Sequence, residues 1–408
     1  MKTFVVNCGS SSIKYKLYDM TDESVLANGL VERVGDANAE LHHQAGNGPM
    51  HRFKIVAPDH FAAMKEVLAK LTDPQVGVLK SIDEITGVGH RVLHAGDKYS
   101  DPVAIDDKVI SVIRDYCVLG PLHNPANLDG IKASMAAMPG TPQVAVFDTA
   151  FFATMPPRAW MYAVPMEWYE KYRVRKYGFH GTSHRYVAYQ TSRLLNKPQD
   201  QVNLITCHLG NGCSMTAVQN GKAIEHSMGL TPLEGLVMGT RTGDIDPSVV
   251  FYLIQNAGMT PTEVDTYLNK KSGLLGVSGV SNDMRDCLKA AEGGNERAKL
   301  AVELFTYRII KYIGSYYTIL PSVDAIVFTG GIGENSVQIR SAVCEGLKRL
   351  GVEMDAKLND ETRRGKSGPI TTANSKIPVW IVPTNEELMI ARDTLQIVTG
   401  KCSDSACC

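Results

Sequence analysis

The sequence lacks the features that define several large classes of protein. Its 408 residues contain no apolar run near the ~18 residues that a membrane-spanning helix needs, so we expect no such helix. The first apolar run is short and ends at Asn7, which predicts no secretory signal peptide. Basic and acidic residues nearly balance, 42 against 43, so we expect neither nucleic acid nor an anionic membrane as a partner held by bulk charge.

The cysteines lack a disulfide or zinc-binding pattern. There are nine, an odd number, and no CxxC pair occurs among them. The simplest interpretation is a set of reduced thiols in a cytoplasmic protein. The chain ends in Cys407 and Cys408, but a prenylation motif needs cysteine fourth from the end, where Ser405 stands. We therefore expect a frayed tail and no lipid anchor.

What is present is a repeated pattern of strands. The length predicts two or three domains at about 150 residues each. Residues 3–34 contain three strand-like segments, and helical and strand units follow as far as an apolar strand at 143–147. Residues 203–226 contain three more, followed by helices and by a buried strand at 324–329. Both halves therefore predict one α/β plan, duplicated, with a cleft between the copies.

Two matched turns connect the first two strands of each copy. They are NCGSSSIK at 7–14 and HLGNGCS at 208–214. Turns of this kind present backbone N–H groups that bind phosphate oxygens, and Lys14 would add a positive charge. A plain hairpin turn is the alternative for either segment alone, but two matched turns favour phosphate binding.

A third glycine-rich segment, FTGGIGENS at 328–336, follows a strand and precedes a helix. Its glycines allow close approach of a ligand, and the positive end of the helix would face that ligand. The alternative is a tightly packed helix cap. Neither the GxGxxG nor the P-loop spacing is present. Phosphate-type turns without those fingerprints point to the fold shared by actin, sugar kinases and the Hsp70 ATPase domain, which holds ATP between two duplicated domains.

Several charged residues stand in settings suited to chemistry. Arg91 and Arg241 lie in glycine-lined loops, from which a guanidinium can bind a carboxylate or a phosphate. Asp148 ends an apolar strand, where it could bind a metal or act as a general base. His180 could donate to a transferring phosphoryl group. A surface arginine, a capping aspartate and a packed histidine are the alternatives, and His184 is closer to a packed histidine.

A magnesium site is a further candidate. Glu386 starts the last helix after the segment PTNEE, and it could reach a magnesium ion in the cleft directly or through water. Asn7 could do the same from the first turn. Helix capping is the commoner role for residues at this position, with Thr384 or Asn385 as the cap and Glu387 favouring the helix N-terminus.

The motifs together closely resemble the acetate kinase (acetokinase) family over essentially the whole chain. The matching segments are NCGSSSIK at 7–14, GHRVLHAG at 89–96, PLHNP at 121–125, VFDTAFFATMPP at 146–157, RKYGFHGTSH at 175–184, HLGNGCS at 208–214, PLEGLVMGTRTGDIDP at 232–247, KSGLLGVSG at 271–279, SNDMRD at 281–286, FTGGIGENS at 328–336 and PTNEE at 383–387.

The resemblance implies a fold and an assembly. The fold is α/β, with two actin-like ATPase (ribonuclease H-like) domains and an interdomain cleft. The first domain comprises residues 1–150 and the C-terminal helix 386–399, and the second comprises 151–385. The family also implies a homodimer.

The resemblance also implies roles for individual residues. Asn7 and Glu386 resemble the Mg²⁺ site, for which Mn²⁺ is a potential substitute. Arg91 resembles the residue that holds the substrate carboxylate. The implied catalytic residues are Asp148, at the acid/base position, and His180 and Arg241, which stabilise the transition state. The implied contacts to ATP or ADP are Lys14, His208, Leu209, Gly210, Asn211, Gly212, Asp283, Met284, Arg285, Gly331, Ile332, Gly333, Glu334 and Asn335. Met284 departs from the pattern, because an aromatic residue is expected there near the adenine.

The implied reaction is reversible, direct in-line phosphoryl transfer from ATP to acetate, which gives acetyl phosphate and ADP. Such transfer depends on positioning and charge neutralisation. Because acetate is already an anion, we expect Asp148 to organise the metal and its water, and not to remove a proton. The candidates for a small pocket around the methyl group are Leu93, Leu122, Phe179 and Pro232. One extra methylene changes binding by only about 1–3 kcal/mol, so propionate should be a poorer substrate and not a rejected one.

Two alternatives remain open at this point. The enzyme could be a propionate or butyrate kinase. The chain could instead be a non-enzymatic ATP-binding protein of the actin or Hsp70 kind. A chaperone would need a substrate-binding domain, for which no residues remain, and an actin-like filament protein would not need paired arginines beside the γ-phosphate.

Overall fold

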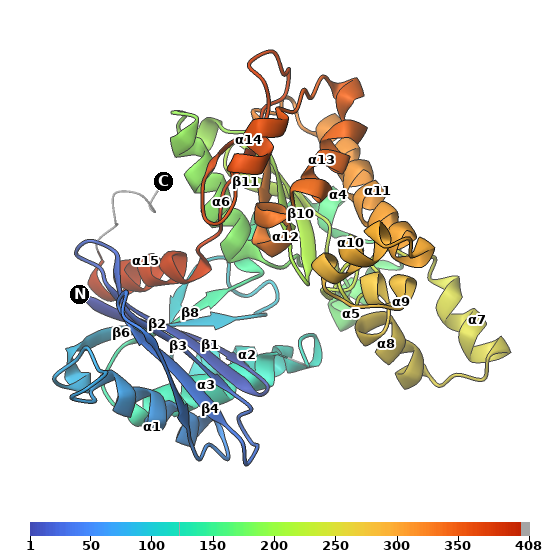
Figure 1. Ribbon diagram of the computed structural model, residues 1–408. Helices are drawn as coiled ribbons and strands as arrows, with labels where there is room; N and C mark the ends of the chain where they lie inside the picture. Colours follow the sequence, from blue (N-terminus) through green and yellow to red (C-terminus); the bar gives the residue numbers. More distant parts are fainter. Residues whose placement is uncertain (122, 401–408) are drawn as a thin grey trace. The chain divides into compact units, whose positions relative to one another are not determined.

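The structure is a computed structural model that describes residues 1–121 and 123–400 (Figure 1). The chain divides into two compact units. Unit 1 comprises Met1–Phe151 and the segment that begins at Asn385, and unit 2 comprises Phe152–Thr384. Within the described residues, no helix is both long enough and apolar enough to cross a membrane.

Unit 1 is built on an eight-stranded sheet with the order β5-β4-β3-β2-β1-β6-β8-β7. Its strands are β1 (Lys2–Gly9), β2 (Ser12–Asp19), β3 (Ser24–Glu32), β4 (Glu40–Ala45), β5 (Met50–Lys54), β6 (Ile85–Val92), β7 (Val103–Ala104) and β8 (Gln143–Phe147). β1, β2 and β3 pair antiparallel, whereas β6 is parallel to both β1 and β8. The three strands expected at 3–34 and the strand at 143–147 are confirmed, and β4 and β5 extend the sheet beyond them.

Helices cover both faces of this sheet. They are α1 (His60–Leu71), α2 (Asp107–Asp115), α3 (Asn124–Ala137) and α15 (Glu386–Thr399), and short 3₁₀ segments lie at Ile82–Glu84 and Tyr116–Val118. Val88 of β6 belongs to the core that α1 and α3 form with β1–β4. Gly89, one residue on, faces α15, because a Cβ there would lie 2.6 Å from Ile390. Since neighbouring strand residues point to opposite faces, α15 covers the face opposite α3.

Unit 2 repeats the central part of this plan. Its six-stranded sheet has the order β11-β10-β9-β12-β14-β13. The strands are β9 (Leu204–Leu209), β10 (Cys213–Gln219), β11 (Lys222–His226), β12 (Ala325–Thr329), β13 (Gly368–Pro369) and β14 (Val379–Ile381). β9, β10 and β11 pair antiparallel, and β12 is parallel to β9 and β14. The succession of three antiparallel and two parallel strands in each unit confirms the duplicated α/β plan.

Helices make up much of unit 2. They are α4 (Pro157–Trp160), α5 (Met166–Tyr172), α6 (Gly181–Leu194), α7 (Ser248–Asn256), α8 (Pro261–Lys270), α9 (Gly273–Ser278), α10 (Met284–Glu292), α11 (Glu296–Ile319), α12 (Gly330–Asn335), α13 (Val337–Gly346) and α14 (Ala356–Glu361). Further 3₁₀ segments lie at Ala150–Thr154, Gln199–Gln201 and Lys348–Leu350. α6 packs on β9 and β12, while α11 packs on α9, α10 and α13.

The third glycine-rich segment differs from the expectation in one respect. A helix was expected after the motif, and α13 does begin at the cap Ser336, but α12 already starts at Gly330 within it. Gly330 has φ +76°, and a Cβ at this position would lie 2.8 Å from the Leu209 carbonyl oxygen. Only glycine fits such a close approach between strand ends, so β12 can turn directly into a helix.

Candidate active site

In unit 1, a guanidinium and a carboxylate meet at the ends of two parallel strands. Arg91 is the penultimate residue of β6 and pairs with Val146 of β8, so Asp148 follows directly beside it. Arg91 Nη2 donates to Asp148 Oδ2 at 2.7 Å, and Nε donates to Oδ1 at 3.1 Å. The Asp148 side chain is only 1% exposed. This bidentate, charge-assisted pair fixes the plane of the guanidinium.

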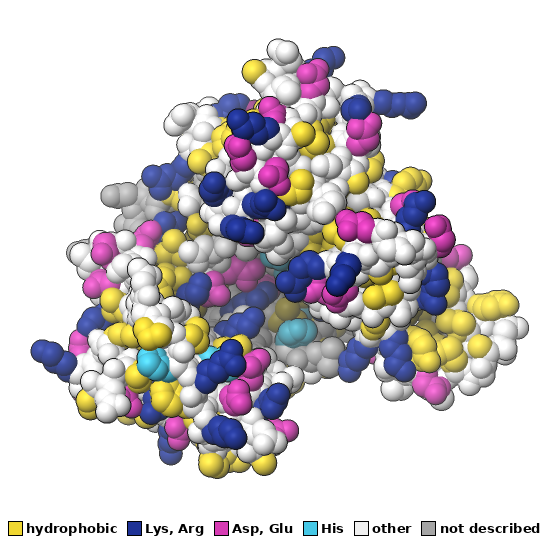
Figure 2. Space-filling model, viewed as in Figure 1, with side chains coloured by type: hydrophobic (Ala, Val, Ile, Leu, Met, Phe, Trp, Pro, Cys, Tyr) yellow, Lys and Arg dark blue, Asp and Glu magenta, His cyan; other side chains and the backbone are white. Residues whose placement is uncertain are grey.

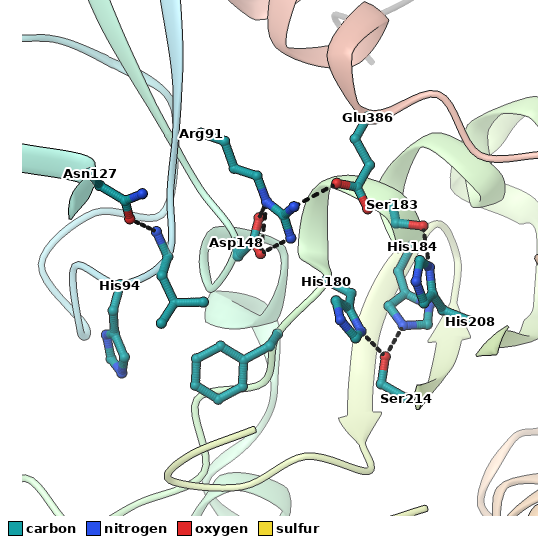
Figure 3. A network of polar contacts seen from close by, with 12 residues as sticks. Arg91, His94, Asn127, Asp148, His180, Ser183, His184, His208, Ser214 and Glu386 are labelled. Atoms are coloured by element: carbon teal, nitrogen blue, oxygen red, sulfur yellow. Dashed lines mark hydrogen bonds and ion pairs between the residues drawn. The ribbon is translucent and has the colours of Figure 1, made fainter. Parts of the chain in front are cut away.

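Glu386 approaches the same guanidinium from α15 (Figure 3). It is the first residue of the helix, where Asn385 caps by accepting from Leu388 N–H, and its Oε2 lies 3.2 Å from Arg91 Nη1. Burial raises the pKa of Glu386, and the Asp148 and Glu387 carboxylates add to that rise against the opposing effect of Arg91. For Arg91, burial lowers the pKa, but the two carboxylates outweigh burial and the pKa rises overall.

Asn7 and Lys14 lie on the β1–β2 hairpin of the same unit. They are cross-strand partners, and the positive charge of Lys14 acts to lower the pKa of Glu386. The structure therefore brings Asn7, Lys14, Arg91, Asp148 and Glu386 into one unit. The turn between the two strands holds the His60 ring, whose Nε2 lies 2.8 Å from the Gly9 carbonyl oxygen.

The donor set of unit 1 fits a magnesium ion. Among the described residues, no group of three or more His, Cys, Asp or Glu side chains forms a closed metal cage. Mg²⁺ seldom uses such a cage, because it keeps several waters and takes one or two carboxylates along with substrate oxygens. A divalent cation beside Glu386 would offset the burial and the carboxylate repulsion that raise the pKa of that group.

An asparagine that no sequence motif singles out links two strand ends. Asn127 of α3 accepts from Leu93 N–H at 3.0 Å and donates to the Cys8 carbonyl oxygen at 2.8 Å. It thereby links the ends of β1 and β6, and it fixes the backbone from which Leu93 projects. Leu122 lies outside the described residues.

In unit 2, histidine rings and hydroxyls gather at the facing ends of β9 and β10 and at the start of α6. His180 is the N-cap of α6 and has φ +60°, a left-handed conformation that is costly for histidine. Its Nδ1 lies 2.8 Å from Ser214 Oγ, and His184 Nε2 lies 2.8 Å from the same oxygen (Figure 3). His184 is fully buried, as expected of a packed histidine. Burial, with His226 and His208 nearby, holds its pKa well below the usual value.

Arg241 lies beside these rings in a different environment from Arg91. Its Nη1 donates to the Pro232 carbonyl oxygen at 3.2 Å, and no carboxylate within the described chain pairs with it. Burial lowers its pKa. A Cβ on Gly212 would lie 3.5 Å from His180 Nε2 and 3.6 Å from Arg241 Nη1. The two donors therefore converge on the glycine-rich turn between β9 and β10.

A pocket of about 610 Å³ lies in unit 2. Its walls include eight of the residues selected from the sequence: Gly210, Asn211, Asp283, Met284, Arg285, Gly331, Ile332 and Asn335. Sequence reasoning missed Asn282, Leu288, Lys289, Glu292, Ser336 and Gln338. Most of these follow the predicted residues by a few positions on α10 or α12–α13, so helical spacing could have found them. The pocket combines apolar walls with the amino-terminal ends of two helices.

The remaining candidates of unit 2 lie elsewhere. Glu334 Oε1 accepts from Gly330 N–H at 2.9 Å and braces the start of α12. Gly333 accepts from the buried guanidinium of Arg340, and His208 Nδ1 lies 2.8 Å from Ser183 Oγ. Phe179 is buried, and its N–H donates to His226 Nε2. Leu209 and Gly212 lie at the β9–β10 turn and do not line the pocket.

Comparison with known proteins gives one consistent result. The model of the acetokinase family matches residues 2–392. The acetate kinase of Dictyoglomus turgidum is 51% identical over 98% of each chain. A solved acetate kinase of Porphyromonas gingivalis superposes with a TM-score of 0.93, at 46% identity over 98% of this chain and 100% of that one. A solved propionate kinase of Francisella tularensis superposes with a TM-score of 0.91, at 41% identity over 97% of this chain and 99% of that one. The chain therefore belongs to the acetokinase family.

Proposed function

We propose that this protein is an acetate kinase, which transfers the γ-phosphoryl group of ATP reversibly to acetate. The observation that carries the proposal is the Arg91 guanidinium, held in a fixed plane by Asp148 at the end of two parallel strands. A guanidinium held in this way suits a planar carboxylate. Membership of the acetokinase family and a pocket with helix N-termini in unit 2 support the same function.

The substrate carboxylate would bind on the Nη1 side of Arg91. Asp148 occupies Nε and Nη2 of the guanidinium, and Glu386 contacts Nη1. The Glu386 contact is the longer and more exposed of the two, so it is the one that can be exchanged. We propose that acetate replaces Glu386 at Nη1 while Asp148 keeps the guanidinium in place. In this account Asp148 acts on the orientation of Arg91, which refines the metal-organising role expected from the sequence.

The transferring phosphoryl group would meet Arg241 and His180. Both present donors to the β9–β10 turn of unit 2, where Arg241 has no carboxylate partner in the described structure. A desolvated guanidinium is available to a phosphoryl oxygen without first breaking an ion pair. The adenosine part would occupy the pocket, with Met284, Leu288 and Ile332 against the base.

A magnesium ion would be held by Glu386 and Asn7, with Mn²⁺ as a substitute. The metal, when bound, would neutralise charge on the β- and γ-phosphates. Moving Glu386 from Arg91 to the metal would also free Nη1 for acetate. Metal binding and acetate binding should therefore be coupled through Glu386.

The acyl pocket would be small because of Leu93, which Asn127 fixes through the backbone. Phe179 and Pro232 are the proposed pocket residues of unit 2. Propionate kinase is the second candidate, favoured by the likeness to the Francisella structure. One methylene changes transition-state binding by only about 1–3 kcal/mol, so propionate should be used less efficiently than acetate.

A homodimer is proposed from an exposed apolar surface formed by α7, α8 and α11. No residue of α7 is buried, and Phe251, Tyr252 and Tyr307 are more than half exposed. Figure 2 shows apolar side chains gathered over α7 and α8 at the right of the molecule. Exposed apolar side chains gathered in this way mark an interaction site, and a second copy of the chain is the proposed occupant. Light scattering should give a dimer mass, and Phe251→Glu with Tyr252→Glu should give a monomer.

The proposed activity is tested by trapping acyl phosphate as hydroxamate, using purified protein, ATP, Mg²⁺ and linear acids of one to four carbons. Acetate should give the highest kcat/KM, with propionate about 10-fold or more below it. A higher value for propionate would favour the second candidate. Absence of product from every acid would reject the kinase assignment.

A further inference from the structure

A chain of buried hydroxyls and rings runs from β9 to the His180 ring. Thr206 Oγ1 lies 2.7 Å from His184 Nδ1, His184 Nε2 lies 2.8 Å from Ser214 Oγ, and Ser214 Oγ lies 2.8 Å from His180 Nδ1. Thr206, His184 and Ser214 are all fully buried, so bulk solvent does not reach these contacts. Each contact is a hydrogen bond with one donor and one acceptor. Because a hydroxyl and a neutral imidazole each have one proton to donate, a group that accepts from one neighbour donates to the other.

The order of elements explains why the chain is continuous. β9 and β10 pair antiparallel, which places Thr206 opposite Thr216 and Ser214 opposite His208. Ser214 and Thr216 point to the same face of the sheet, since they are two residues apart. His180 and His184 are four residues apart at the start of α6, so they lie on one side of that helix. The helix packs on β9 and brings both rings onto the hydroxyls.

The Thr206 hydroxyl determines the direction of the chain. Its only side-chain hydrogen-bond partner in the described structure is His184 Nδ1. A buried hydroxyl that accepted from His184 would leave its own proton without an acceptor, at a cost of about 1–3 kcal/mol. Thr206 therefore donates to Nδ1. The neutral His184 ring then carries its single proton on Nε2 and donates to Ser214, which in turn donates to His180 Nδ1.

We infer that Thr206, His184 and Ser214 are positioning residues that hold His180 in the tautomer with its proton on Nε2. Nε2 and Cε1 form the edge of the ring that faces Gly212, beside Arg241 Nη1. The chain thus aims a neutral N–H donor at the place where the proposed reaction puts the phosphoryl group. A proton on Nδ1 of His180 would require every bond to reverse, and would leave the Thr206 hydroxyl without an acceptor. The role in catalysis rests on the proposed function, whereas the tautomer does not.

The tautomer can be measured in the ligand-free protein by proton–nitrogen correlation NMR of ¹⁵N-histidine-labelled samples, with His180→Gln to assign the ring. The wild-type His180 should show a protonated Nε2 and an unprotonated Nδ1. Thr206→Val should abolish this single state, because His184 loses the donor that sets its own tautomer. Thr206→Ser should keep it. A wild-type His180 protonated on Nδ1, or an unchanged ring in folded Thr206→Val, would overturn the inference.

Thr216→Val is the matched control. Thr216 Oγ1 lies 2.9 Å from His226 Nδ1 in the same cluster, but this bond runs the other way: His226 Nε2 accepts from Phe179 N–H, so Nδ1 donates to Thr216, and the ring does not reach His180. This variant should leave the His180 ring unchanged. In the acetate assay, Ser214→Ala should lower kcat about 10- to 100-fold with little change in KM for ATP, as when the group that orients a functional imidazole is removed. An unchanged kcat in Ser214→Ala would contradict the catalytic role. Failure of the wild type to make any acyl phosphate would reject the function and leave the tautomer result standing.

Discussion

The two units share the order of their central strands and differ in the chemistry around their arginines. In unit 1, Arg91 is paired with two carboxylates, one of them almost fully buried. In unit 2, Arg241 is half-buried and donates to the Pro232 carbonyl, and the His180 ring lies with it beside Gly212. The two arginines stand at different places in their units, Arg91 on β6 and Arg241 in the loop between β11 and α7, and their different surroundings suit different ligands. Arg91 of unit 1 is suited to exchange the Glu386 carboxylate for that of a substrate. Arg241 of unit 2 is suited to bind an anion without first losing a carboxylate partner.

Removal of Arg91 should have the largest effect of all on activity. It should also lower stability, which would distinguish the role of Arg91 from that of Arg241. Arg91→Ala should lower kcat/KM for acetate by about 10³-fold or more, because the substrate carboxylate loses its charged hydrogen-bond donor at Nη1. It should also lower the free energy of unfolding by about 3 kcal/mol, since Asp148 is left buried without its counter-charge. Acetate kinetics and urea unfolding measure the two effects. Near-normal activity would refute the assigned role.

Removal of Arg241 should affect activity with much less effect on stability. Arg241→Ala should lower kcat about 10²- to 10³-fold through lost stabilisation of the transferring group. The free energy of unfolding should change by about 1 kcal/mol or less, because the partners lost in the described structure are the Pro232 carbonyl and the Met238 sulfur, which are both uncharged. If Arg241→Ala destabilised the protein as much as Arg91→Ala, the contrast between the two arginines would be wrong.

If Glu386 moves from Arg91 to the magnesium ion, its removal should raise the Mg²⁺ concentration that activity requires. Glu386→Gln should raise the Mg²⁺ concentration needed for half-maximal activity about 10-fold, because a charged ligand becomes neutral. Glu387→Gln is the matched control, one residue further into α15, and should leave the titration nearly unchanged. An identical titration for Glu386→Gln and wild type would exclude this residue from the metal site.

Much of the fold was predictable, because strands such as β1, β9 and β12 are apolar runs bounded by glycine. The resemblance to the acetokinase family indicated the roles of Arg91 and Arg241, which their local sequence left open. Other features depend on contacts between distant segments. The start of α12 depends on Gly330 touching Leu209, and the bridge at Asn127 depends on α3 packing across β1 and β6. No local pattern encodes such contacts.

The smallest expected effect is an opposite response of two buried groups to pH. The pKa of Glu386 is raised, so its charged form is disfavoured in the folded state, and its contribution to stability falls as the pH rises above the ordinary value of 4.5. The pKa of His184 is lowered, so its contribution is complete above pH 6.5 and is lost as the pH falls below that value. We expect the free energy of unfolding, measured across pH 4–8, to rise for Glu386→Gln relative to wild type as the pH rises. A pH-independent difference would contradict the burial of a charged Glu386.

The central claim is that an acetate oxygen forms the new bond to the phosphorus of the γ-phosphoryl group that ATP gives up. It is tested most directly by ³¹P NMR of a reaction with ATP, Mg²⁺ and acetate labelled with ¹⁸O in both oxygens. The account predicts acetyl phosphate with ¹⁸O in the bridge between phosphorus and the acyl carbon, and no such product from Arg91→Ala. Formation of only ADP and inorganic phosphate would contradict the account and would favour an ATP-hydrolysing protein without an acyl acceptor.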